Sequence, residues 1–428
     1  MKKTYIDTAM ERIAPDLILK GGNVVDVFSG RVIKADVIIK DGIICGVGSY
    51  SGENEQDVSG KYIMPGFIDS HVHIESSMTQ PSEYAKAVMP HGITTVIADP
   101  HEITNVCGED GLEFMLKSAK NIPLDVNLML PSCVPATPFE HTGANLDAKT
   151  TQKLAPKFFG IGEMMNYPGI VSGDDETLGK LCLDIIDGHA PLLSGHELDA
   201  YASVGIKTDH ECSVVEEMTE KISKGMYILL REGTLSLDVA KLIKGVTPYT
   251  LRRCAFCTDD RFVGEIIRDG SIDHCIRKAV SLGLNNIDAI IMATLNACEI
   301  YGMKNKGAIA PSYVADIVVA DDLNLSSISQ VYKNGKLVCE NGKALFECET
   351  VDNSKVTNTV HLPKISADFF KTDVKDKFDA IELIPESIIT KKVTVSYSDS
   401  LSKVCVIERH HNLGTKGIGF VTNYGITN

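Results

Sequence analysis

Two histidines separated by one residue, His71 and His73, directly follow an apolar run over 62–69. Side chains at positions i and i+2 of a β-strand point to the same face, so both imidazoles can reach one metal ion where the strand ends. Two strand-end histidines that only hydrogen-bond to their neighbours would give the same spacing. Taken alone, the pair is therefore weak evidence for a metal site.

Further histidine and acidic residues follow at intervals that suit the ends of successive strands. These are His101 and Glu102, Glu163, His189, His210 and Glu211, and Asp259 and Asp260. A ligand at the end of each of several strands is a pattern that rarely arises by accident. Zinc, iron and manganese accept such a mixture of imidazole and carboxylate. The series predicts a metal-dependent hydrolase.

Two of these positions compete with other interpretations. Glu163 ends the apolar run 158–162, and it is either a metal ligand or a solvated or helix-capping glutamate. His189 follows another apolar run, and His196 competes with it for the same role. We favour His189, because His196 lies further along, where the next helix should begin.

The remaining strand-end pairs also allow two roles. Asp259 and Asp260 follow the last predicted strand, where one can bind metal and carry protons while the other contacts substrate. They could equally cap the following helix, which does not exclude the first role. His101 and Glu102 are either pocket residues or ordinary polar loop residues.

These residues need a scaffold that brings many strand ends together. Between residues 66 and 307, short apolar runs alternate with helical stretches. The predicted strands are 66–70, 94–98, 126–131, 158–163, 185–188, 205–208, 226–231 and 254–258. The helical segments between them include 81–89, 111–118, 176–183, 214–224, 237–243 and 287–297. Eight such alternations predict an α/β chain with a (β/α)8 TIM-like barrel, whose active site lies at the carboxyl ends of its strands.

Strand-and-turn segments flank the barrel on both sides. Residues 1–65 and 308–350 share short strands and tight turns, so we predict one composite β-sandwich domain interrupted by the barrel. For residues 365–428 we predict a partial C-terminal α+β domain, with strands at 391–396, 404–407 and 417–421. We expect its apolar strand residues Val404, Val406, Ile418 and Phe420 to lack part of their cover.

Composition narrows the classes of function. The chain has 428 residues, is 44% hydrophobic and carries a net charge of -15. This balance, without any basic run, argues against nucleic acid and anionic membranes as partners. Twelve scattered cysteines, no apolar export signal and no membrane-length apolar stretch predict a cytoplasmic protein with reduced thiols. A homo-oligomer is compatible with these features.

Several of the motifs resemble those of one family. The stretches that carry the resemblance are 65–77, 98–103, 162–166, 187–191, 208–211 and 257–261. Together they are similar to the bacterial adenine deaminases of the amidohydrolase superfamily, over about residues 16–421. The resemblance implies hydrolysis of adenine to hypoxanthine and ammonia, a reaction of purine salvage. It also implies a site for two divalent ions, with manganese or iron as the usual occupants and zinc as an alternative.

The resemblance gives the metal ligands, and the chemistry of the site gives the other residue roles. The resemblance implies metal ligands at His71, His73, Glu163, His189, His210 and Asp259. Asp259 is the expected proton carrier, with Glu102 or Glu211 as alternatives, and Glu163 also orients the attacking water. We expect Asp260 and His101 to contact the purine.

Two alternatives remain open. Cyclic-amide hydrolases of the dihydroorotase and hydantoinase kind usually bridge their metals with a carbamylated lysine, where this chain has Glu163. In the adenine deaminases, the stretch that resembles 408–421 is followed by a segment with a His-Asp-Ser-His motif, which is missing here. The sequence therefore predicts a relative truncated at its C-terminus, and an inactive homologue is the second alternative.

Overall fold

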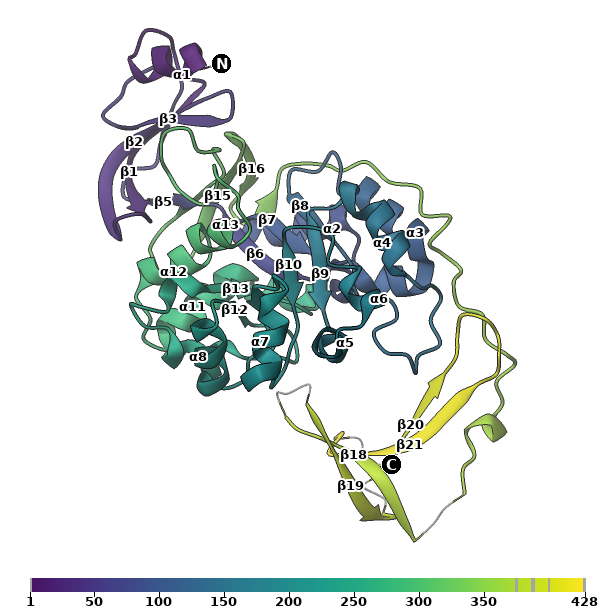
Figure 1. Cartoon of the computed structure of the whole chain (residues 1–428). Coiled ribbons are helices and arrows are strands. Elements are labelled where there is room, and N and C mark those ends of the chain that lie inside the picture. The colour runs from purple at the N-terminus through teal and green to yellow at the C-terminus, as the bar shows by residue number, and fades with distance from the viewer. Residues whose placement is uncertain (1, 374–375, 386–388, 399–400, 426–428) are drawn as a thin grey trace.

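The computed structural model describes residues 2–373, 376–385, 389–398 and 401–425. A β domain with the N-terminus lies on one side of a central barrel, and a separate yellow sheet lies beyond the opposite side (Figure 1). Within the described residues, no helix combines the length and the apolar character that crossing a membrane requires.

Strands that precede the barrel in the chain and strands that follow it form one nine-stranded sheet. Strand β5 joins them, because it pairs with β1 on one side and antiparallel to β14 on the other. Apolar residues far apart in sequence, such as Val24, Ile63 and Ile317, are buried together beneath the sheet. The elements are α1 (Lys2–Ala9), β1 (Leu17–Asp26), β2 (Arg31–Lys40), β3 (Ile43–Gly48), β4 (Glu55–Asp57), β5 (Tyr62–Pro65), β14 (Ile317–Ala320), β15 (Ile328–Lys333), β16 (Lys336–Glu340) and β17 (Lys343–Ala344).

The central part confirms the predicted (β/α)8 barrel. Parallel pairing links β6 to β10 in one sheet and β11 to β13 in a second. The first and last strands meet where Asp259 N donates to His71 O at 2.9 Å and His73 N donates to Asp259 O at 3.2 Å. The strands are β6 (Phe67–Val72), β7 (Ile93–Ala98), β8 (Asp125–Leu130), β9 (Gly160–Met164), β10 (Ile186–Gly188), β11 (Thr208–Asp209), β12 (Tyr227–Arg231) and β13 (Cys254–Cys257).

Helices surround this barrel and differ from the predicted ones in three places. The predicted helix 111–118 is the second half of α3, which begins at His101. The predicted helix 176–183 is only α6, which ends before Gly179. The predicted helix 287–297 is split into α12 and α13, because Thr294 has non-helical angles of φ -137 and ψ -85. The helices are α2 (Pro81–Val88), α3 (His101–Ser118), α4 (Ala148–Leu154), α5 (Tyr167–Ser172), α6 (Asp175–Leu178), α7 (Gly195–Ser203), α8 (Val215–Ser223), α9 (Val239–Leu242), α10 (Val263–Asp269), α11 (Ile272–Ser281), α12 (Asn286–Met292) and α13 (Leu295–Ile300).

The C-terminal residues form a four-stranded sheet in the order β19-β18-β21-β20. Its strands are β18 (Lys377–Leu383), β19 (Thr390–Ser396), β20 (Ser402–Ile407) and β21 (Lys416–Thr422). Phe420 is buried against Ala380 and Leu401, so the prediction that it lacks cover is wrong. Val406 is 70% exposed, as predicted. An extended segment, held by an ion pair between Lys355 and Asp110, leads to this sheet along the barrel (Figure 1).

Candidate metal centre

The two histidines of the first barrel strand face each other inside the barrel. Strand β6 is buried along its whole length, because the β domain, the neighbouring strands and the helices enclose it. His71 is 0% exposed and His73 is 2% exposed, with 3.1 Å between their Nε2 atoms. His73 Nδ1 donates to the carbonyl oxygen of Asp99 at 2.8 Å, which leaves Nε2 directed into the site.

Glu163 lies at the centre of the cluster, at the end of β9. Its Oε2 is 2.8 Å from His189 Nδ1 and 2.9 Å from His210 Nε2, and its Oε1 is 3.6 Å from His73 Nε2. Burial raises the pKa of Glu163, but the charges of His189 and His210 outweigh it and lower the pKa well below its ordinary value. The carboxylate therefore stays ionised and contacts imidazoles from three strands.

The backbone at Glu163 is held by the side chain of Asp99, which directly follows strand β7. Asp99 Oδ2 accepts a hydrogen bond from Glu163 N at 3.0 Å. A side chain at Gly162 would place its Cβ 2.2 Å from that same oxygen, so only glycine allows this close approach. Glycine before Glu163 is therefore part of how β9 presents the carboxylate.

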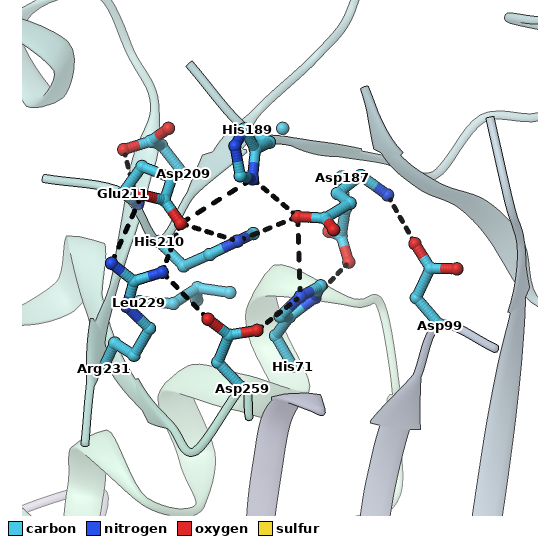
Figure 2. Close-up of polar contacts among 12 residues, drawn as sticks. His71, Asp99, Asp187, His189, Asp209, His210, Glu211, Leu229, Arg231 and Asp259 are labelled. Carbon is cyan, nitrogen blue, oxygen red and sulfur yellow. Dashed lines mark hydrogen bonds and ion pairs between the residues drawn. The ribbon is translucent and has the colours of Figure 1, made fainter. Parts of the chain in front are cut away.

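Asp259 completes the cluster from the end of β13. Its backbone turns into the left-handed region, with φ 55, which places Oδ1 3.0 Å from His73 Nε2 and 3.8 Å from His71 Nε2. Burial raises the pKa of Asp259, but the hydrogen bond from His73 and nearby positive charges lower it far below its ordinary value. Figure 2 shows this carboxylate directed at His71 on one side and Arg231 on the other.

The donor set fits a divalent transition metal. Ligand atoms of His71, His73 and Glu163 lie within 4.8 Å of one another, as do those of Glu163, His189 and His210. Among the described residues, His71 Nδ1 and His210 Nδ1 are buried without a hydrogen-bond partner. Burial lowers the pKa of His189, but the charge of Glu163 raises it to about 9, so the metal-free site holds protons that a cation would displace.

A second polar group lies beside this centre and contains a residue that the sequence analysis missed. His101 Nδ1 is 3.4 Å from Glu163 Oε1, which places His101 next to the metal candidates. The missed residue is Ser76, whose hydroxyl donates to Glu102 at 3.2 Å and also to Asp260. Its position in the sequence, three residues after His73, could have indicated this role. Asp260 is exposed and Glu102 is partly exposed, so this group faces solvent.

Arg231 is the other missed residue. It ends β12, where a charge closes an otherwise apolar run, and it is 3% exposed. Its guanidinium donates to Glu211 and, through Nη1 at 2.8 Å, to Asp259 Oδ2 (Figure 2). It thus lies between two predicted catalytic carboxylates.

A buried ion pair supports the loops that carry His189 and His210. Lys221 is 0% exposed and donates to Asp209 Oδ2 at 2.9 Å and to the carbonyl oxygen of Ala190 at 2.7 Å. Asp209 Oδ1 in turn accepts from Ala190 N at 2.9 Å. The two loops are therefore tied together directly behind their histidines.

The choice between His189 and His196 leads to a testable prediction. His196 lies on α7 with a fully exposed side chain, whereas His189 contacts Glu163. We expect His189→Ala to weaken manganese binding by more than the roughly 10- to 100-fold that loss of an outer partner costs. The matched control His196→Ala should bind as the wild type does, measured by chelator competition. Equal affinity in both variants would remove His189 from the ligand set.

Comparison with known families and with solved structures places the chain in a known class. It matches the amidohydrolase family over residues 62–338 and belongs to that family. The solved enamidase structure, 18% identical, has a TM-score of 0.58 and covers 77% of this chain and 97% of its own. Atrazine chlorohydrolase from Arthrobacter aurescens, solved with zinc, is 15% identical with a TM-score of 0.55 and covers 79% of this chain and 98% of its own. At these identities the likeness concerns the fold.

Within this family, the chain belongs to the adenine deaminases. It is 46% identical to the adenine deaminase of Clostridium acetobutylicum, over 98% of this chain and 77% of that protein. It is 44% identical to adenine deaminase 2 of Desulfotalea psychrophila, over 99% of this chain and 77% of that protein. The chain thus spans about three quarters of the length of these relatives.

Proposed function

We propose that this protein hydrolyses adenine to hypoxanthine and ammonia at the barrel site. The observation that carries the proposal is the position of Glu163, whose carboxylate contacts histidines from three strand ends within a buried cluster. The similarity to the adenine deaminases supports adenine as the substrate. The reaction is one of purine salvage.

Six residues would hold the metal. They are His71, His73, Glu163, His189, His210 and Asp259. We propose two divalent ions, because the ligand atoms form more than one compact set around Glu163. Manganese and iron suit these ligands, and zinc is an alternative. A divalent cation supplies Lewis-acid chemistry and makes hydroxide available near neutral pH.

The chain's own groups move the proton. The exocyclic amine of adenine is a poor leaving group until its nitrogen is protonated and it can leave as ammonia. A carboxylate must therefore take a proton from the attacking water and deliver it to the purine. Asp259 is suited to this task, because Oδ1 faces the histidines while Oδ2 is fixed by Arg231. Glu211 bonds to Arg231 through both oxygens, and Glu102 bonds to Ser76, so they remain alternatives.

The exposed side of the site would bind the base. Asp260 and Glu102 present carboxylate oxygens that accept hydrogen bonds, and adenine offers N–H donors at its ring and its exocyclic amine. His101 lies between Glu102 and Glu163 and would contact the ring. A cytoplasmic location and a homo-oligomer stay predictions.

The test is ammonia release by purified protein that has been stripped of metal and reloaded with manganese, iron or zinc. We expect metal-dependent turnover of adenine and none of a dihydropyrimidine. Turnover of the dihydropyrimidine alone would favour the cyclic-amide alternative. A protein that binds manganese but converts neither compound would identify an inactive homologue.

A further inference from the structure

We propose that Arg231 is a positioning residue that assigns different tasks to two neighbouring carboxylates. It leaves Asp259 one oxygen for the metal centre, and it keeps Glu211 away from the metal. This inference rests on the proposed function. It goes beyond that function, because it explains why Asp259 reaches the metal centre and the neighbouring Glu211 does not.

The contacts of Arg231 are unequal on its two sides. Towards Glu211, Nη1 and Nη2 each bond to a different carboxylate oxygen, the second at 3.3 Å. Towards Asp259, only Nη1 bonds, and only to Oδ2, at 2.8 Å. A guanidinium can bind a carboxylate through two parallel hydrogen bonds, and Glu211 receives that full arrangement. Asp259 therefore retains Oδ1 for His73 and His71.

Glu211 is close enough to compete for metal if it were released. Its Oε1 is 3.6 Å from His210 Nε2 and 3.7 Å from His189 Nδ1. Its side chain is as buried as that of Glu163 and more buried than that of Asp259. A small rotation would bring another anionic oxygen among the ligand nitrogens, and the two bonds from Arg231 oppose that rotation.

Arg231 is itself held in place from behind. Its Nε donates to Asp238 Oδ2 at 3.1 Å, and Lys241 donates to Asp238 Oδ1 at 2.9 Å. The guanidinium therefore keeps a fixed plane, on which the geometry of both acids depends. Lysine at this position would keep the charge but would lose the planar array of donors.

The experiment compares Arg231→Lys with the wild type, both loaded with manganese. We expect kcat for adenine to fall by roughly 100-fold, as a misplacement of about 1 Å can cause, with KM nearly unchanged. Manganese affinity, measured by chelator competition, should stay equal or become tighter, because Glu211 gains access to the ion. The manganese EPR spectrum should change, and the added change Glu211→Gln should return it towards the wild-type form.

Further variants separate this role from a merely structural one. Arg252→Lys is the matched control, since that arginine is exposed and pairs with Glu299 on the surface. This variant should behave as the wild type does. If Arg231→Lys fails to fold, Glu211→Gln alone tests the claim: wild-type manganese affinity supports it, and weakened affinity shows Glu211 to be a ligand and overturns it.

The outcomes distinguish this inference from the proposed function. If the wild type binds manganese and deaminates adenine while Arg231→Lys matches it in kcat and EPR spectrum, only the role of Arg231 is overturned. Manganese binding that weakens together with kcat also overturns it, because Arg231 would then merely support the site. If the wild type neither binds manganese nor deaminates adenine, both proposals fall.

Discussion

Asp259→Asn should abolish adenine turnover, with kcat falling by about 1000-fold or more, while the fold stays intact. General acid–base catalysis contributes roughly 10²- to 10⁴-fold, and this change also removes a ligand charge. Asparagine tolerates the left-handed backbone at this position, where φ is 55, and its side-chain oxygen can still accept from Arg231. Ammonia release measures the loss, and circular dichroism with thermal unfolding checks the fold.

The neighbouring residue supplies the control for this prediction. Asp260 is exposed and bonds to Ser76, so Asp260→Asn should mainly raise KM for adenine and affect kcat less. If Asp259→Asn retained near-wild-type ammonia release, Asp259 would not be the proton carrier, and Glu102 and Glu211 would be tested next.

Lys221→Met should lower the free energy of unfolding by about 3–5 kcal/mol, the usual cost of breaking a buried ion pair. Lys221 and Asp209 are both 0% exposed, so the change leaves a carboxylate buried without its counter-charge. Urea unfolding of the metal-free protein measures the loss. The lost stability should lower the urea concentration at the unfolding midpoint. The slope of the unfolding free energy against urea concentration should change little.

Lys224→Met is the matched control, because this lysine follows the same helix and pairs with Asp199 at the surface. A surface pair contributes roughly 0–1 kcal/mol, so this variant should unfold close to the wild type. Equal losses in the two variants would show that the buried pair does not support the loops behind His189 and His210.

The barrel was predictable because most of its strands are apolar runs buried on both faces. Strand β7, for example, is fully buried, and its observed bounds, Ile93–Ala98, differ from the prediction by one residue. The predicted strand 205–208 was less accurate, since β11 contains only Thr208 and Asp209. Gly205 has φ 93 and belongs to the turn after α7, so pairing starts later than the apolar pattern indicates.

Residues that follow a strand could be predicted as site candidates, but their partners could not. His71, Glu163 and Asp259 each lie at a strand end, which the chain order reveals. Arg231 also ends a strand, yet an arginine after an apolar run often extends to solvent, and only the packing of three neighbouring loops shows its contacts. The division into 1–65 with 308–350, 66–307 and 365–428 stays a prediction.

The meeting of the first and last barrel strands has a consequence for how the site comes into being during folding. Thr258 bonds to Asp69 across 189 residues of chain, immediately below the two histidines and Asp259. Contacts this distant in sequence require a large loop to close and generally form slowly. The complete set of candidate metal ligands, which includes Asp259, therefore cannot form until the eighth strand has joined the first. An ion that binds only the closed barrel shifts the folding equilibrium towards it by mass action. A bound metal would therefore stabilise the closed barrel as well as take part in the reaction.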